Sequence, residues 1–231
     1  MTHPPMGTRQ RHHCRHAGRI STAVVVAALL VPKTAVAEDP MLLIDRDGFM
    51  LRAHLQAGIN AVAEQNLFWN YADIFAPGAD FDSDTDWLEG YLMPGLSFTQ
   101  EIGAGLAIYG KISAVASGTI GIDAFAVGNT GRLTLEEGYL GIRSEDDGSD
   151  PAFDLSLGPR EFKAGTGMLI ANGGTSGFER GALKLGPRKA WEDAALARFD
   201  AGPVSATAFY LDANELERND SSTRIVGGDI R

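Results

Sequence analysis

Cysteine and long apolar runs are both scarce in this chain. Its single cysteine, Cys14, lies near the N-terminus, so the rest of the sequence offers neither disulfides nor cysteine metal ligands. No run of about 18 apolar residues occurs, which is the length that a transmembrane helix needs. These two absences argue against thiol chemistry and against a helical membrane protein.

The N-terminal 37 residues have the three parts of an export signal. Four arginines between positions 9 and 19 precede an apolar stretch, Ile20 to Val31, and then Ala35-Val36-Ala37. A basic region, an apolar core and an A-x-A site predict a signal peptide over residues 1–37, with the mature protein starting near Glu38. The alternative is an uncleaved anchor helix, for which twelve apolar residues are too few.

Charge narrows the choice of partner. Signal removal would take away five basic residues and no acidic one, leaving 15 basic and 30 acidic residues and a formal net charge of −15. Nucleic-acid binding relies on basic patches that neutralise phosphates. The sequence therefore predicts no nucleic-acid partner.

The stretch Leu51–Glu64 alternates between apolar and polar residues. Every odd position is apolar, whereas most even positions carry polar side chains such as His54. Side chains of a β-strand point to opposite faces in turn, so the pattern predicts a strand with one apolar and one polar face. Its fourteen residues exceed the usual five or six and suit a strand that crosses a bilayer, which needs about nine to eleven.

Similar patterns predict seven more strands after a short N-terminal lead (residues 38–49) that ends in a turn at 45–48. Their ranges are 87–100, 104–118, 131–144, 153–163, 188–199, 204–213 and 223–231. The apolar face of the 131–144 strand changes phase near Glu136-Glu137, which predicts a β-bulge there. The connections alternate between long and short, as in single-chain outer-membrane barrels. A soluble β-sandwich explains the alternation but neither the strand length nor the asymmetry of the loops.

Several segments together carry a family resemblance. They are LEEGYLGIRS (135–144), DLSLGPR (154–160), GTGMLI (165–170), RGA (180–182), LGPRKAWE (185–192), AR (197–198) and GP (202–203). Through these segments the chain resembles the alginate export family of outer-membrane porins, over roughly residues 50–231. The resemblance implies an antiparallel transmembrane β-barrel of about eighteen strands in the Gram-negative outer membrane. This chain would supply about eight of them and stop in mid-strand at residues 229–231.

The resemblance also implies a function and a site. An anionic polysaccharide or a related solute would pass without catalysis or a cofactor, and the partners would be that solute, outer-membrane lipid and periplasmic export proteins. By motif match, the constriction arginines are Arg143, Arg160, Arg188 and Arg180. Arg52 and Lys111, on the polar faces of their strands, complete the expected pore lining. Arginine offers a permanently charged fork that suits carboxylates, and rings of charge set pore selectivity.

Other constellations have competing interpretations. Asp80, Asp82, Asp84 and Asp86 alternate in a way that suits a calcium loop, but Thr85 and Tyr91 stand where such a loop needs Gly and Glu; a solvated outer loop is the alternative. His54 could serve a barrel hydrolase, although no G-x-S-x-G accompanies it. The Gly-rich stretch 165–177 suits a loop that folds inward. A small, non-conducting eight-stranded barrel with a structural or adhesive role is the alternative to the porin.

Overall fold

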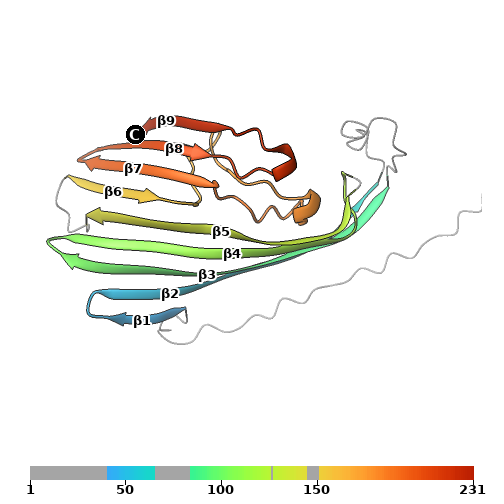
Figure 1. The fold of residues 1–231 in the computed structure, drawn as a ribbon, viewed down its shortest axis with the longest axis horizontal. Coiled ribbons are helices and arrows are strands. Elements are labelled where there is room, and N and C mark those ends of the chain that lie inside the picture. The colour runs from blue at the N-terminus through green and yellow to red at the C-terminus, as the bar shows by residue number, and fades with distance from the viewer. Residues whose placement is uncertain (1–40, 66–83, 126, 145–150) are drawn as a thin grey trace, which may run out of the picture. The chain divides into compact units, whose positions relative to one another are not determined.

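The computed structural model describes residues 41–65, 84–125, 127–144 and 151–231. The expected signal peptide and most of the 65–84 connection lie outside these ranges. Nine strands form one antiparallel sheet in chain order (Figure 1). The strands are β1 (Leu42–Arg46), β2 (Phe49–Glu64), β3 (Thr85–Gly103), β4 (Leu106–Ile122), β5 (Gly128–Ser144), β6 (Ala152–Leu157), β7 (Asp193–Ala201), β8 (Val204–Asp212) and β9 (Arg224–Ile230).

Tight turns fix the register at one end of the sheet. Asp47 and Gly48 join β1 to β2 with φ of 54° and 71°, so both central residues of the turn are left-handed, as a two-residue hairpin prefers. Ala104 and Gly105 turn β3 into β4 in the same way. From the first of these turns, β2 and β3 pair without a break from Phe49↔Gln100 to Glu64↔Thr85. An unbroken register keeps the alternation of the two strands in phase, so the odd-numbered apolar residues of β2, such as Leu55 and Ile59, share one face with Leu88 and Leu92 of β3.

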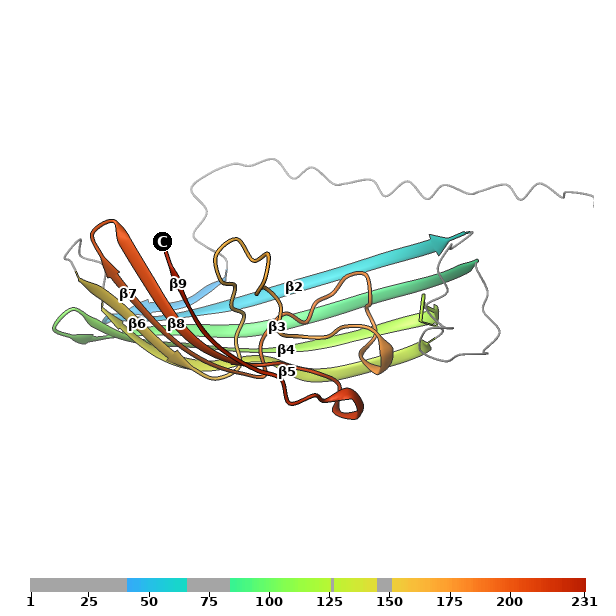
Figure 2. The same cartoon turned by 90° about the horizontal axis from the view of Figure 1, so that it is seen from above.

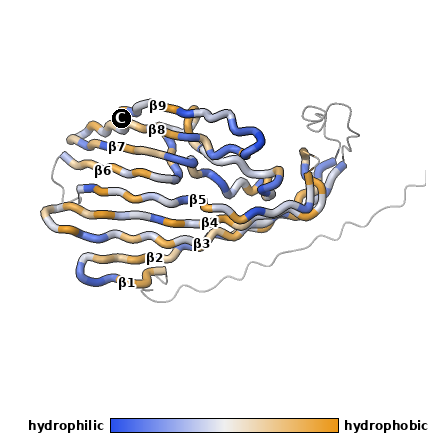
Figure 3. The backbone as a smooth tube through the Cα atoms, in the orientation of Figure 1, coloured by the Kyte–Doolittle hydropathy of each residue, from blue (hydrophilic) through white to orange (hydrophobic). Residues whose placement is uncertain are grey.

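The sheet has one apolar and one polar face. On the apolar face, Ile59, Ile120 and Leu133 expose 76%, 67% and 70% of their surface. The opposite face carries polar side chains such as Ser113 and Glu89, which are buried. The alternation appears as a change of colour along each strand in Figure 3. Figure 2 shows that the sheet is curved and that the chain between β6 and β7 lies on its concave side, which is therefore the polar face.

A bulge in β5 keeps its apolar residues on the convex face. Ser113 pairs with Glu137, and the next residue, Ala114, pairs with Leu135, so Glu136 is an extra residue. Because of the bulge, both glutamates point to the concave side, where they are 1% and 5% exposed. The predicted bulge at Glu136-Glu137 is confirmed.

The β5–β6 ladder is short, and its end starts the longest connection of the chain. Only Leu140 to Arg143 of β5 pair with β6, because the chain leaves the sheet at Gly158. This residue has φ of 116°, and a Cβ on it would lie 2.4 Å from the carbonyl oxygen of Gly138, so the position requires glycine. Residues 158–192, hereafter the 158–192 connection, contain the 3₁₀-helix η1 (Phe178–Arg180).

Two buried carboxylates of the sheet hold the 158–192 connection. Glu89 on β3 accepts hydrogen bonds from the backbone N–H groups of Lys184 and Leu185 at 3.1 and 2.7 Å. Glu136 on β5 accepts those of Lys189 and Ala190 at 2.6 and 2.8 Å. Carboxylates that accept backbone N–H groups make strong, charge-assisted bonds. These four bonds fix the connection against β3–β5.

An apolar cluster fixes the other side of the connection. Trp191, Ala194, Phe209 and Leu211 are buried together where the connection meets β7 and β8, and Phe162 packs against them. The indole N–H of Trp191 also donates to the carbonyl of Phe162 at 3.1 Å. Both the start of the connection, at Phe162, and its end, at Trp191, therefore pack against β7 and β8.

The sixth expected strand, 188–199, runs instead from Asp193 to Ala201, and the sequence-based boundaries differ from the structure in three further places. Part of the expected lead forms β1, which raises the strand count from the expected eight to nine. The stretch 119–130, which separates two expected strands, is mostly strand, because β4 continues to Ile122 and β5 begins at Gly128. The fifth expected strand, 153–163, ends at Leu157. No helix in the described part of the chain is long and apolar enough to cross a membrane.

Candidate anion site on the concave face

Tyr109, Asp154 and Arg143 form one cluster across three strands. Tyr109 on β4 pairs with Gly141 on β5, and a Cβ on Gly141 would lie 2.5 Å from the tyrosine ring. The missing side chain lets the ring cross β5, so its hydroxyl donates a hydrogen bond to Asp154 on β6. The Arg143 guanidinium carbon lies 5.1 Å from the centre of the same ring, a cation–π distance. Arg143 makes no ion pair within the described residues.

Arg160 stands beside this cluster at the start of the 158–192 connection. Its guanidinium carbon lies 4.3 Å from the ring centre of Tyr139, and its Nη1 donates to the hydroxyl of Ser156. Its Nε is buried and has no hydrogen-bond partner in the described structure. A buried donor without an acceptor is costly, so this part of Arg160 is not fully satisfied by its surroundings.

A cavity of about 430 Å³ separates the connection from the concave face of β6–β9. Four basic and two acidic side chains line it, together with small polar and apolar residues. The lining residues are Asp154, Ser156, Arg160, Phe162, Lys163, Gly165, Leu196, Arg198, Ser205, Thr207, Asp229 and Arg231. The excess of basic side chains makes the cavity a candidate anion site.

The basic side chains of the cavity differ in whether they form ion pairs with carboxylates. Arg198 binds Asp200 at 2.9 Å, and Arg231 binds Asp229 at 2.8 Å. Lys163, by contrast, has no hydrogen bond or ion pair within the described residues. The positive charge available to a ligand therefore comes mainly from Lys163 and Arg160.

The predicted pore residues divide into two groups. Arg52 and Lys111 lie on the concave faces of β2 and β4, as Arg143 does on β5; Lys111 pairs with the buried Glu137. Arg180 and Arg188 belong to the 158–192 connection itself, and their side chains are buried, with 7% and 2% exposure. The structure thus brings Arg143 and Arg160 together near the cavity and places Arg180 and Arg188 elsewhere.

Arg188 has a structural role in its present position. Its guanidinium donates to the hydroxyls of Ser117 and Thr134 at 2.6 and 3.1 Å and to the carbonyl of Arg132 at 3.2 Å. Burial, and to a smaller extent the nearby charge of Arg180, lower the pKa of Arg188 to about 10, and the charge of Glu136 opposes them. Arg188 therefore stays charged at neutral pH and joins the connection to β4 and β5.

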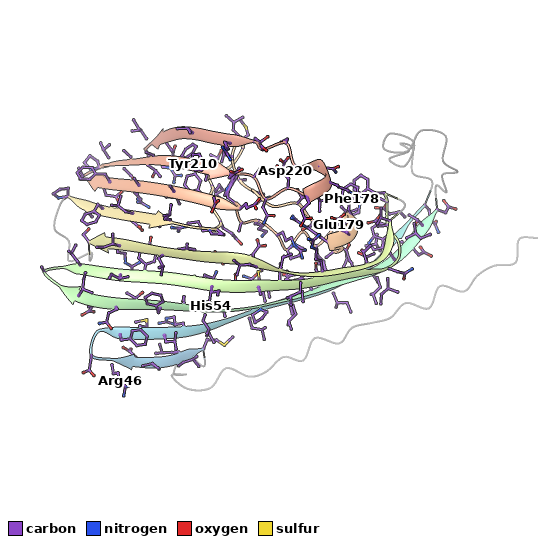
Figure 4. The ribbon with its side chains drawn as sticks, viewed as in Figure 1. Arg46, His54, Phe178, Glu179, Tyr210 and Asp220 are labelled. Carbon is purple, nitrogen blue, oxygen red and sulfur yellow. The ribbon has the colours of Figure 1, made fainter. Side chains whose placement is uncertain are left out.

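Arg180 at η1 joins two connections. It donates to the carbonyl of Thr175, to the side chain and carbonyl of Asn214 and to the carbonyl of Glu215. Burial also lowers its pKa. Its neighbours Phe178 and Glu179 are labelled in Figure 4, beside the β8–β9 connection that contains η2 (Glu217–Asn219).

The other sequence candidates have these positions. Asp80 and Asp82 lie outside the described residues, and the part that is described contains no group of three acidic, His or Cys residues suited to a metal. His54, labelled on β2 in Figure 4, lies 2.7 Å from the hydroxyl of Ser97, measured from its Nε2. Glu136 and Glu137 share a face through the bulge, and their partners are backbone N–H groups, Lys111 and Ser113.

Sequence reasoning missed three of the four basic lining residues, Lys163, Arg198 and Arg231. Arg198 and Arg231 stand at alternate positions with Asp200 and Asp229, so the polar side of two strands carried a usable signal. Lys163 lies in an irregular segment, where no period marks the side on which a residue lies. Comparisons with protein-family models, curated proteins and solved structures found no match for this chain.

Proposed function

We propose that the chain belongs to an anion-selective channel of the Gram-negative outer membrane, which passes an anionic saccharide without catalysis. One observation carries this proposal: the sheet is apolar on its convex face, and its concave face holds a cavity with more basic than acidic residues. The resemblance to the alginate export family supports the choice of a uronate-type polysaccharide as solute. Periplasmic export proteins would be its further partners.

The convex face suits lipid. Large exposed apolar patches mark contact with membranes or proteins, and here they continue along several neighbouring strands, through Ile59, Leu92, Ile112 and Leu133. The strands from β2 to β5 have 16 to 19 residues, more than the roughly nine to eleven that a tilted strand needs to cross a bilayer. Lipid contact would account for exposed side chains that water disfavours.

The concave face suits a carboxylate solute. Arg143 and Lys163 have no acidic partner within the described residues, and Arg160 has a buried, unpaired Nε. A polyuronate carries one carboxylate on each sugar, so it would meet successive cations as it passes. Arginine and lysine next to a low-dielectric wall attract anions more strongly than in bulk water.

Reversal potentials across planar bilayers test the proposal. In a salt gradient, the channel is expected to prefer anions, and Arg160→Ala together with Arg143→Ala should shift the potential toward cation preference. Arg46→Ala removes one positive charge, as each of these substitutions does alone, from β1 (labelled in Figure 4) and outside the cavity lining, and should leave the potential unchanged. An equal potential in all these variants would reject the arginines as the selective element.

A second candidate function rests on the position of the 158–192 connection. The connection covers the concave face of β3–β5 and is fixed there by four backbone bonds to Glu89 and Glu136. A fixed cover favours a closed barrel with a structural or adhesive role. Conductance separates the two candidates, because a closed barrel gives no current steps.

A further inference from the structure

The cavity between the 158–192 connection and β6–β9 combines charge with a fixed apolar wall. Phe162 lies 5.1 Å from Phe209, centre to centre, and packs against the buried cluster around Trp191. Leu196 on β7 packs against the same cluster and also lines the cavity. A channel that only attracts anions needs no such apolar wall.

Two basic residues of the cavity lie close in sequence to Phe162, which is part of this apolar wall. Arg160 and Lys163 flank Phe162, and all three line the cavity. Arg198 and Arg231 are largely neutralised by Asp200 and Asp229. Asp154, which accepts a hydrogen bond from Tyr109, contributes one negative charge. Together with the positive charges of Arg160 and Lys163 it leaves a net charge of about +1, which one monovalent anion would balance.

The cavity is also bounded on the side of β9. Gly165 of the connection donates its N–H to the carboxylate of Asp229 at 3.3 Å and accepts a hydrogen bond from Arg231 at 3.2 Å. The volume of about 430 Å³ lies within the range of small-molecule pockets, about 300–1,000 Å³. A bounded pocket of this size fits one ring better than a polymer that threads through it.

We propose that this cavity is a discrete binding site for a small free carboxylate with an apolar body, of the size of an aromatic monocarboxylate. The carboxylate binds the two lining cations, Lys163 and Arg160, and the ring lies against Phe162 and Leu196. Charge fixes one end of the ligand and apolar contact fixes the other, as in most small-molecule sites. The site is independent of whether the chain conducts ions.

Calorimetric titration of the full chain, refolded in detergent, tests this site. Benzoate is the probe, acetate lacks the apolar body, benzyl alcohol lacks the charge, and glucuronate presents a polar ring. Benzoate is expected to bind about tenfold or more tightly than each of the other three, because each lacks one of the two contacts. Equal affinity for acetate and benzoate, or binding of glucuronate alone, would overturn the proposal.

A matched pair of lysines tests the location. Lys163→Met keeps the apolar stem that lies along Gly167 and removes only the charge; it should lower benzoate affinity about tenfold. Lys189→Met, in the same connection but outside the cavity lining, should bind benzoate as the parent does. Equal affinities in the two variants would place the site elsewhere. Benzoate binding by a parent chain that shows no anion preference in bilayers would contradict the proposed channel function and leave the binding site standing.

Discussion

Glu136 accepts the backbone N–H of Ala190 at 2.8 Å, although 54 positions separate the two residues in sequence. The same oxygen, Oε1, accepts the N–H of Lys189 at 2.6 Å. Glu136 reaches both because the β-bulge turns it toward the concave face, where it is 1% exposed. A local irregularity of one strand thus holds a connection that begins more than twenty residues later.

Replacing Glu136 should loosen the 158–192 connection. Glu136→Leu leaves one buried and one part-buried N–H group without an acceptor, which should lower the free energy of unfolding by about 2–4 kcal/mol. Glu136→Gln keeps one carbonyl acceptor and should cost less. Urea unfolding in detergent micelles measures the change, with the exposed Glu161→Leu as control. Equal unfolding midpoints for Glu136→Leu and Glu161→Leu would contradict the role of the carboxylate.

A cysteine scan along β5 should show a change of parity at the bulge. Because Cys14 is the single cysteine of the chain, Cys14→Ser gives a clean background. Leu133→Cys and Leu140→Cys should react with a lipid-soluble maleimide, and Arg132→Cys and Arg143→Cys, which are accessible on the concave face, with a water-soluble one. The apolar face is thus odd-numbered before the bulge and even-numbered after it. One parity along the whole strand would contradict the observed register.

The sheet could be predicted from the sequence because its signal is local. Alternation along β2 and β3 depends only on the pleat, so each residue reports its own face. The phase change near Glu136 was visible for the same reason. The ends of the strands were predicted less accurately than their faces. β6 ends at Leu157, earlier than expected, because Gly158 makes a close contact with Gly138, which lies 20 positions earlier and on another strand.

The 158–192 connection could not be predicted in the same way. Its contacts join distant residues, such as Leu185 and Glu89, 96 positions apart, and no period in the sequence signals them. Family motifs therefore placed Arg188 with the constriction, whereas tertiary hydrogen bonds bury it. Arg160, by contrast, lines the cavity. It lies only three residues after the end of β6 at Leu157, so the strand largely determines its position.

Arg188 should affect stability more than selectivity. Its three hydrogen-bonding nitrogens bridge β4, β5 and the connection, and lysine cannot reproduce this fork. Arg188→Lys should therefore lower the free energy of unfolding by about 1–3 kcal/mol, while anion preference stays that of the parent. Urea unfolding and reversal potentials are compared in one preparation, with Arg46→Lys as control. A change in selectivity with unchanged stability would instead place Arg188 in the pore.

Asp123 should make stability depend on pH. It lies in the β4–β5 turn, 2% exposed, where Oδ1 accepts the N–H groups of Phe125 and Val127. Oδ2 is buried without a partner in the described structure. Burial raises the pKa of Asp123 above its ordinary value of 3.8; the charge of Glu89 raises it further, and the two hydrogen bonds oppose this change.

The sign of the effect follows from proton binding. A carboxyl with a raised pKa holds its proton in the folded state at a pH where the unfolded chain has lost it, so stability falls as the pH rises. The loss should begin near pH 3.8 and be complete once the pH exceeds the raised pKa. Asp123→Asn cannot titrate and should lack this component. Unfolding midpoints of both proteins from pH 3.5 to pH 7 measure it. Parallel curves would show that Asp123 has the same pKa in both states, whereas a parent curve that falls relative to the variant is the expected result.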